Sequence, residues 1–518
     1  MKLNRITLVT ITMLISSVSL FAQATLPEIF ADHMVFQRQQ PIPVWGWSPA
    51  GTAITVKLAD SQQTTTADKQ GRWRVELPAR PAGGPYTLAI IAGKKTVLFQ
   101  DVLLGDIWLA SGQSNMSMPM RPNLPWSMGV LDYQNEIATA NEKNVRFFMV
   151  PHEPDYPEQT DMHGAWRLSQ GSQVCDVSAL SYYFARMVNR YTDIPIGVIV
   201  SAVGSTSISS WVDIDINKKY HASSVTKLTE ELQSSASQMA EYERSRPEYE
   251  HKQEAFTNGC SSPEAHLDKQ PLEHFIFKPS GLYNAMIYPF HQIPIRGVLW
   301  YQGESDSGNS KEYGQIIQDM IASWRERWHN PGMPFYMVQL ENVENQRRRG
   351  VDFDPNLLHF TEFREMERLT TLRVSHTGIA VAADVGDPYF PHPRNKRAVG
   401  ERMALLALAN DYGQKVVATG PILKSYSRDG NKLVLNFDAQ GGPLVINTGT
   451  VPYGFEIAGI DNVFHPAVSA VDGDTVTLES PLVNEPINAR YGWRENPKLS
   501  LYNTAGLPAS PFSTQSKP

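Results

Sequence analysis

Cysteine is scarce in this sequence: the 518 residues contain only Cys175 and Cys260. Two cysteines in a chain of this length do not make a disulfide framework, and their spacing alone does not fix whether they pair. Histidines at metal-ligand spacing, such as His-x-His or His-Glu-x-x-His, are also missing, which argues against a metal hydrolase. The sequence therefore gives no indication of a metal or another cofactor.

An excess of positive charge is missing too, and so is any long apolar run beyond the N-terminus. The net charge is −7 at pH 7, so nucleic acid and anionic membrane surfaces are not expected partners. Residues 6–21 form one apolar, Ser- and Thr-rich run between a basic start and the small-x-small sequence Ala22-Gln-Ala24. This pattern predicts a cleaved signal peptide over residues 1–24, too short for a convincing membrane span. We therefore expect an exported protein, periplasmic or extracellular, without stable membrane insertion.

The composition that remains is that of a globular protein, 42% hydrophobic and 19% charged, long enough for several domains. Residues 25–104 contain short alternating strands separated by Gly and Pro turns, which predicts an N-terminal β-sandwich-like domain. From 105 to 412, apolar strands alternate with helices, which predicts an α/β domain with a parallel sheet. Residues 413–518 return to short strands and predict a C-terminal β domain. The polar stretch 218–265 predicts a solvated helical insertion into the α/β domain.

The α/β pattern comes from individual segments. Continuous apolar runs predict buried parallel strands at 194–200, 296–301, 334–340 and 377–383. Helical periodicity predicts helices at 179–191, 313–328 and 395–409. Ligands of such sheets bind outside the carboxyl ends of the strands, so the residues that follow each strand are the candidates for chemistry.

The segment Gly105–Met116 contains the first candidate. An apolar strand ends at Ser111-Gly112, and Ser114 follows in a tight turn. A serine there is exposed at the mouth of the sheet, and the backbone N–H groups of the turn can face a developing oxyanion. An ordinary strand end has the same appearance, so a nucleophilic Ser114 requires a base and an oxyanion hole elsewhere in the chain.

Three further strand ends supply such groups. Gly204 follows a buried strand and can bring its N–H close to a substrate. Gln302 offers a side-chain donor after the next strand, and Glu304 can hold a substrate hydroxyl or orient a histidine. His392, between two prolines, precedes the last helix. Each signal alone is weak, but together they place a nucleophile, two donors and a base at successive strand ends of one sheet.

Three motifs then carry a resemblance to a family: Gly105-Asp-Ile-Trp with Ser111-Gly-Gln-Ser-Asn-Met116, Trp300-Tyr-Gln-Gly-Glu-Ser305, and His392-Pro-x-x-Lys396 with Gly400-x-Arg402. They resemble the sialate O-acetylesterases of the SGNH (GDSL-like) hydrolase superfamily, over essentially the whole mature chain. The resemblance implies a three-layer α/β hydrolase domain flanked by β domains. It also implies a serine esterase that removes O-acetyl groups from sialic acids through an acyl-enzyme, without a cofactor.

The resemblance implies roles for single residues as well. Ser114 is the nucleophile and His392 the base, while the backbone N–H groups of Ser114 and Gly204 and the Gln302 side chain form the oxyanion hole. The superfamily usually places an acid three residues before the histidine, but that position is Tyr389 here. The groups that remain to orient His392 are Asp387, Asp384, Glu304, or a main-chain carbonyl that leaves a Ser–His dyad.

The substrate is less defined by the sequence. A sialate has a carboxylate, so an arginine should reach the site; the candidates are Arg364, Arg394 and the run 347–349. An esterase of acetylated xylan or another plant polysaccharide would instead need exposed aromatic side chains; the candidates are Trp126, Trp211 and Tyr389. We predict substrate contacts for Glu304, Trp211 and Arg394. A third hypothesis is a carbohydrate-binding protein with a degenerate hydrolase core, which the missing acid favours and the intact serine, glutamine and histidine oppose.

Overall fold

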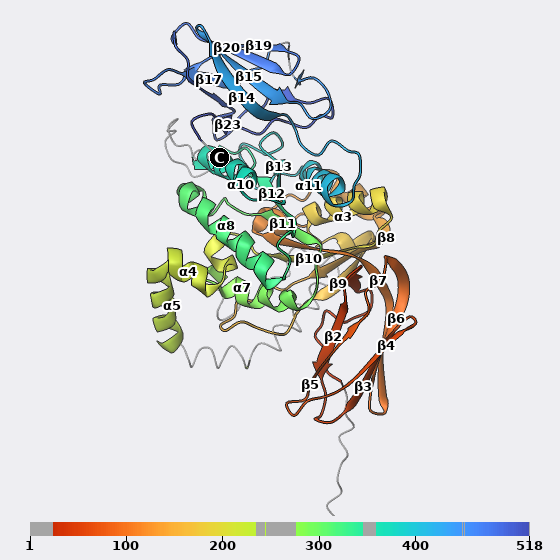
Figure 1. The fold of residues 1–518 in the computed structure, drawn as a ribbon. Helices are drawn as coiled ribbons and strands as arrows, with labels where there is room; N and C mark the ends of the chain where they lie inside the picture. The colour runs from red at the N-terminus through yellow and green to blue at the C-terminus, as the bar shows by residue number, and fades with distance from the viewer. Residues whose placement is uncertain are drawn as a thin grey trace, which may run out of the picture.

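Three parts follow one another along the chain in the computed structural model (Figure 1). The structure describes residues 24–234, 244, 276–344, 359–447, 449 and 451–516. The predicted signal peptide, apart from Ala24, lies outside these residues, as do Cys260, most of the predicted insertion and the arginine run 347–349. Within the described part, the insertion begins with the helices α4 (Ile214–Tyr220) and α5 (Ala222–Ser234). None of the described helices is long and apolar enough to cross a membrane.

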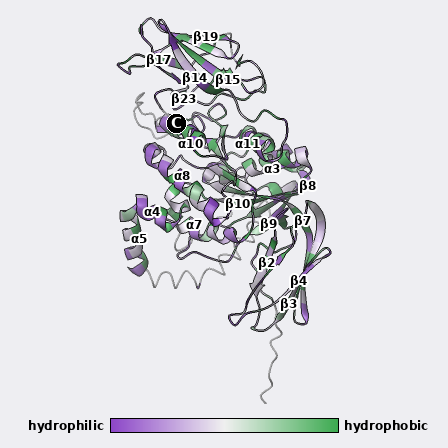
Figure 2. Ribbon diagram, in the orientation of Figure 1, coloured by the Kyte–Doolittle hydropathy of each residue, from purple (hydrophilic) through white to green (hydrophobic). Residues whose placement is uncertain are grey.

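The N-terminal part contains strands in two sheets. One sheet pairs β2 (Ile42–Trp47) with β5 (Arg72–Leu77); the other contains β1 (Val35–Gln37), β3 (Ala53–Leu58), β4 (Ser61–Thr66), β6 (Gly83–Ala92) and β7 (Lys95–Gly112). Residues alternate between exposed and buried along β5, because one face packs on the core and the other meets water. Figure 2 shows the corresponding mixture of hydrophilic and hydrophobic residues along single strands.

Strand β7 joins this part to the next. Its first half pairs antiparallel with β6, and from Asp106 onward it pairs parallel with strands of the central sheet. Every residue from Val102 to Gly112 is buried, as a strand covered on both faces should be. The predicted domain boundary between 104 and 105 therefore falls inside one continuous strand.

The central sheet has the order β13-β12-β11-β7-β10-β8-β9. Its other members are β8 (Asn141–Met149), β9 (Ala165–Gln170), β10 (Ile196–Ala202), β11 (Gly297–Tyr301), β12 (Phe335–Gln339) and β13 (Thr377–Val381). All neighbouring pairs are parallel except β8 with the edge strand β9. The predicted parallel strands are confirmed, within a sheet that is mixed. Since β10 and β11 lie on opposite sides of β7, the carboxyl end of β7 is a point where the strand order reverses.

Helices pack against this sheet in pairs. α3 (Ala179–Thr192) packs against α11 (Lys396–Asp411), and α8 (Ser310–Arg327) packs against α10 (His359–Arg373). Shorter helices lie in the segments between these elements: α1 (Ser114–Ser117), α2 (Tyr133–Thr139), α7 (Gly281–Met286), and the 3-10 turns η1 (Gly171–Val174), η2 (Ile208–Trp211), η4 (Tyr288–Gln292) and η5 (Ser307–Asn309).

The C-terminal part is all-β, as predicted, and its hydrophobic core also includes Val381 and Ala383 of the central part. One four-stranded sheet contains β14 (Ile422–Asp429), β15 (Lys432–Asp438), β20 (Thr475–Glu479) and β19 (Val468–Asp472). A second contains β18 (His465–Pro466), β17 (Phe455–Ala458), β21 (Asn488–Tyr491) and β23 (Phe512–Ser513). A short pair joins β16 (Val445–Ile446) to β22 (Leu501–Tyr502). Figure 1 shows this part at the opposite end of the molecule from the N-terminal strands.

Candidate functional site

Ser114 begins the short helix α1 directly after β7, at the point where the strand order reverses. The preceding turn requires a glycine at position 112 for two reasons. Gly112 has a φ of +136°, and a Cβ at this position would lie 2.1 Å from the carbonyl oxygen of Tyr301. The backbones of β7 and β11 therefore approach too closely for a side chain. The N–H of Gln113 then donates to Tyr301 O at 2.9 Å, which fixes the turn in front of Ser114.

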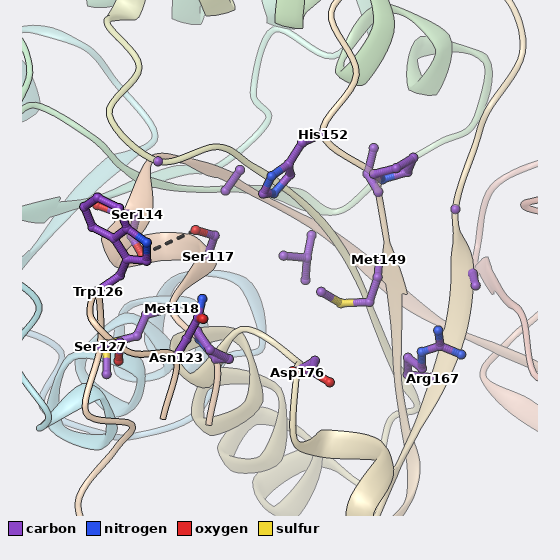
Figure 3. A pocket seen from close by; sticks show the side chains of 18 of the residues that line it. Ser114, Ser117, Met118, Asn123, Trp126, Ser127, Met149, His152, Arg167 and Asp176 are labelled. Atoms are coloured by element: carbon purple, nitrogen blue, oxygen red, sulfur yellow. Dashed lines mark hydrogen bonds between the residues drawn. The ribbon is translucent and has the colours of Figure 1, made fainter. Parts of the chain in front are cut away.

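A cavity of about 560 Å³ opens beside this serine, and Ser114, Gly204 and His392 all line it. The structure thus brings together three residues that the sequence predicted from segments almost 280 positions apart. Gly204 lies so close to Ser114 that a Cβ at position 204 would come within 3.4 Å of the serine Cβ. Figure 3 shows the cavity with Ser114 and Trp126 at one end.

His392 is oriented by a main-chain carbonyl. Its Nδ1 lies 2.6 Å from the carbonyl oxygen of Trp126. A carbonyl oxygen only accepts hydrogen bonds, so Nδ1 carries the proton and Nε2 is the basic nitrogen of the neutral ring. This is the tautomer that a general base acting on Ser114 requires.

The acids considered for this role make other contacts. Asp387 Oδ1 accepts hydrogen bonds from the N–H groups of Tyr389 (2.8 Å) and Phe390 (3.2 Å), a local turn of the type aspartate often forms. Asp384 forms a two-pronged ion pair with Arg402, with distances of 2.6 and 2.7 Å. Among the groups that could orient His392, the geometry favours the Trp126 carbonyl.

Gln302 is not among the residues that line the cavity. Its side chain is buried, and its Nε2 lies 3.0 Å from Thr206 O, 2.6 Å from Asp306 Oδ2 and 3.2 Å from Gln113 Oε1. These contacts hold the loop after Gly204 to the turn before Ser114. Burial raises the pKa of Asp306 to about 6, although the hydrogen bond from Gln302 acts to lower it.

The three predicted substrate contacts do not reach the cavity either. Trp211 has no exposed surface: its ring packs edge-on against Trp300, and its Nε1 donates to Thr206 Oγ1 at 2.9 Å. Arg394 donates to the carbonyls of Gly129 and Val130, both at 3.2 Å. Neither side chain is part of the cavity wall, and the polar atoms named here have partners within the fold.

Glu304 is also outside the cavity wall, and its Oε1 accepts a hydrogen bond from Asn115. Burial, together with the charge of Glu341, raises the pKa of Glu304 to about 8. Arg364, the other buried candidate, donates to four main-chain carbonyls and has no exposed surface. A sequence pattern marks the strand end from which such side chains come but not the side of the turn on which they lie.

The cavity wall contains charged residues that the sequence did not reveal. Arg121 donates through Nε to Asp176 Oδ1 at 2.7 Å, and Arg167 of β9 lies near the same carboxylate. Burial raises the pKa of Asp176, although both arginines act to lower it. Figure 3 shows Arg167 and Asp176 at the end of the cavity away from Ser114. These residues come from a loop and an edge strand that carry no recognisable motif.

His152 also lines the cavity, and no sequence motif marks it as a site residue either. Figure 3 shows its ring facing the open space beyond Ser117. Within the described ranges, no group of three or more His, Cys, Asp and Glu side chains is placed to hold a metal ion. Cys175, next to Asp176 in the wall, is disulfide-bonded.

Comparison with known proteins gives one consistent result. A family model described as "Carbohydrate esterase, sialic acid-specific acetylesterase" matches residues 104–240 and 270–404. A sialate O-acetylesterase from Rattus norvegicus is 27% identical over 93% of each chain. The one from Homo sapiens is 27% identical over 92% of this chain and 90% of that chain. The crystal structure of a carbohydrate acetylesterase from Xanthomonas citri superposes with a TM-score of 0.80 at 34% identity, covering 96% of this chain and 100% of that chain.

Proposed function

Because the chain belongs to the sialic acid-specific acetylesterase family of carbohydrate esterases, we propose that it is a serine esterase that removes O-acetyl groups from sialic acids. The observation that carries the proposal is the shared cavity of Ser114, Gly204 and His392, in which the Trp126 carbonyl leaves His392 Nε2 as the base. The same family membership supports a three-layer SGNH arrangement for the central domain.

The proposed reaction has two steps. Ser114 Oγ attacks the acetyl carbonyl while His392 Nε2 takes the hydroxyl proton, and the backbone N–H groups of Ser114 and Gly204 stabilise the oxyanion. His392 then protonates the departing sugar oxygen, which leaves an acetyl ester on Ser114. Water gives its proton to His392 and attacks this ester, and acetate leaves as Ser114 Oγ takes the proton back. Gln302, the predicted third donor, supports the reaction through the loops that it holds in place.

Recognition of a sialate requires a partner for its carboxylate. We propose Arg167, with Arg121 beside it, because both are cationic side chains in the cavity wall, near the carboxylate of Asp176. A guanidinium group presents a planar fork of donors that matches the two oxygens of a carboxylate, which an acidic ligand would supply. They lie at the far end of the cavity, so an acetyl group at Ser114 and a carboxylate at Arg167 would belong to two ends of one substrate.

A second candidate function is deacetylation of a neutral polysaccharide, such as acetylated xylan. Trp126 lines the cavity and is 68% exposed, so its ring is available to stack on a sugar. The Xanthomonas citri relative is described as a carbohydrate acetylesterase without mention of sialic acid. An O-acetylated sugar is the expected partner in both cases.

The decisive measurement is acetate release from O-acetylated sialic acid and from acetylated xylan, with the wild type and its Ser114→Ala, His392→Ala and Arg167→Ala variants. We expect sialate turnover, reduced by about 10⁴-fold or more in the first two variants. Arg167→Ala should lower kcat/KM for the sialate at least about tenfold and leave hydrolysis of neutral 4-nitrophenyl acetate unchanged. His152→Gln is the matched control, since that histidine lines the same cavity. Turnover of xylan alone would replace the proposal with the second candidate.

We also propose that the protein is exported, on the strength of its first 24 residues. The supporting features are the basic start, the apolar run and the small-x-small sequence that ends it. Cell fractionation of the full chain should recover a shortened protein outside the cytoplasm, whereas a variant lacking residues 2–24 should stay inside. Recovery of full-length protein in the cytoplasm would contradict the proposal.

A further inference from the structure

The side chain of Asn115, next to Ser114, makes contacts that the proposed reaction does not use. Its Nδ2 donates to the carbonyl oxygen of Pro391 at 2.9 Å, and its Oδ1 accepts from Lys396 Nζ at 2.6 Å. Pro391 comes directly before His392, and Lys396 comes four residues after it. One amide therefore holds the histidine loop on both sides of the proposed base.

The same amide is also tied to two strand ends. Its Nδ2 lies within hydrogen-bond distance of Glu304 Oε1, which follows β11, and 3.2 Å from Glu341 Oε1, which follows β12. The other oxygen of Glu341 accepts from the Tyr301 hydroxyl at 2.7 Å. The turn with Ser114, two neighbouring strand ends and the histidine loop therefore meet at one side chain.

This cluster is closed to solvent. Asn115 is 1% exposed, and Glu341 and Lys396 are fully buried. A buried polar group costs free energy unless it is hydrogen-bonded, so the cluster tolerates few changes. Asparagine suits the central position because it offers donors to carboxylate and carbonyl oxygens and an acceptor to the ammonium group. An aspartate there would have no N–H group for the Pro391 carbonyl and would add a third carboxyl group to the cluster.

We propose that Asn115 is a positioning residue that sets Ser114 against His392. Its side chain fixes the turn that carries Ser114 to the buried carboxyl groups of Glu304 and Glu341. The same side chain holds the loop that carries His392 through Pro391 O and Lys396 Nζ. The inference rests on the proposed Ser114–His392 chemistry. The Trp126 carbonyl determines how the imidazole ring is turned, and Asn115 determines where the loop that carries the ring lies. Together, the two contacts take the place of an acid three residues before His392, where this chain has Tyr389.

The test uses Asn115→Asp, which keeps the size of the side chain and removes its donors. With 4-nitrophenyl acetate and with O-acetylated sialic acid, we expect kcat to fall about 100-fold, the effect of a misplaced catalytic group, while KM stays within about threefold. Adding Glu304→Gln should recover at least about tenfold in kcat, because the new amide at position 304 donates to the new carboxylate at 115. A residue that only fills space would not show this reciprocal rescue.

The matched control is Asn503→Asp in the C-terminal part. Asn503 is also 1% exposed, and its Nδ2 donates to Thr419 O at 2.9 Å, far from the cavity wall. Its kcat should stay within about twofold of wild type. Full kcat in Asn115→Asp, or a well-folded double variant no better than the single one, would overturn the inference.

A further variant keeps the inference testable if Asn115→Asp does not fold. Lys396→Met removes the ammonium group and leaves the Asn115 donors in place, and we expect the same fall in kcat at nearly constant KM. Wild-type kcat in Lys396→Met would then overturn the inference.

The outcomes distinguish the proposed function from this inference. An inactive wild type, or an active Ser114→Ala variant, would overturn both. Full activity of Asn115→Asp in an active enzyme would overturn the inference alone.

Discussion

At the scale of single residues, the orientation of His392 is the feature with the most direct consequence. A carbonyl at Nδ1 selects the reactive tautomer, as a triad aspartate does. It carries no full charge, however, and stabilises the imidazolium that forms during the reaction less than a carboxylate would. In the proposed mechanism, the Trp126 carbonyl therefore takes the orienting role that an aspartate has in a Ser–His–Asp triad.

This arrangement predicts the behaviour of Asp387. Replacing it by Asn keeps an oxygen for the N–H groups of Tyr389 and Phe390, so Asp387→Asn should retain kcat/KM within about threefold. Asp387→Ala should lose more, because the turn that leads to His392 is no longer fixed. Steady-state hydrolysis of 4-nitrophenyl acetate distinguishes the cases. A fall of about 10⁴-fold in Asp387→Asn would identify this residue as a triad acid after all.

The residues that the sequence predicted correctly for the cavity share one property. Ser114, Gly204 and His392 lie in segments that follow strands of the central sheet, so their positions follow from where those strands end. Trp211 and Gln302 also follow strand ends, but long side chains can turn toward the core, and both do. Arg121 and Arg167 were not predicted, because no periodicity or motif distinguishes a cavity arginine from a surface one.

At the scale of elements, most helices and strands lie where periodicity placed them. The predicted helix 179–191 is α3, and the predicted strands 194–200 and 334–340 are β10 and β12. Both strands begin later than predicted, after Pro195 and Pro334, because proline has no N–H to donate to the sheet. The carbonyls of these prolines accept hydrogen bonds from Asp106 and Val298 instead. The extension of β7 across the predicted boundary was missed, since an 18-residue strand with two different sets of neighbours has no signature of its own.

The element η4 contains His291, a histidine with buried ring nitrogens that predicts how stability depends on pH. Both ring nitrogens of His291 are buried without a hydrogen-bond partner among the described residues, and the ring packs edge-on against Trp328 with centroids 4.2 Å apart. Burial, with the nearby charge of Arg327, lowers the pKa of His291 to about 3. Between about pH 6.5 and pH 3, the unfolded chain therefore binds a proton at this histidine that the folded protein does not, so the free energy of unfolding falls as the pH falls.

His291→Phe should remove this dependence while keeping the aromatic contacts. The contribution of one such group is about 1.4 kcal/mol per pH unit within that window, and the variant should show a correspondingly shallower slope. Urea unfolding of both proteins at about pH 4, 5 and 6 measures the difference. Equal slopes would mean that His291 is protonated in the folded protein.

At the scale of the whole molecule, the C-terminal part is attached at the same strand end that supports the site. Gln339 at the end of β12 donates to Ser510 Oγ at 2.7 Å, and Asn342 donates to Asn496 Oδ1 at 2.8 Å. Glu341, between them, belongs to the cluster around Asn115. The position of the C-terminal part is thereby coupled to the groups beneath Ser114.

Arg364 is the centre of this attachment, and its replacement tests the coupling. Its guanidinium donates to the carbonyls of Leu340 (2.8 Å) and Glu341 on one side and of Arg494 (2.9 Å) and Glu495 (2.7 Å) on the other. Arg364→Met should lower the free energy of unfolding by about 3–5 kcal/mol or more, because each stranded buried carbonyl costs about 1–3 kcal/mol. Arg364→Lys should recover only part of this loss, since an ammonium group lacks the planar fork that reaches four acceptors.

Calorimetric unfolding and acetyl ester turnover, measured on the same samples, decide the outcome. The exposed Arg428, whose ion pair with Glu485 spans 3.6 Å, provides the control, and Arg428→Met should cost less than about 1 kcal/mol. If Arg364 couples the two parts, its Met variant unfolds in two separate transitions and loses kcat at a temperature where the central domain is still folded. A single transition with wild-type kcat would show that the C-terminal part is held by its apolar contacts alone and that the site does not depend on it.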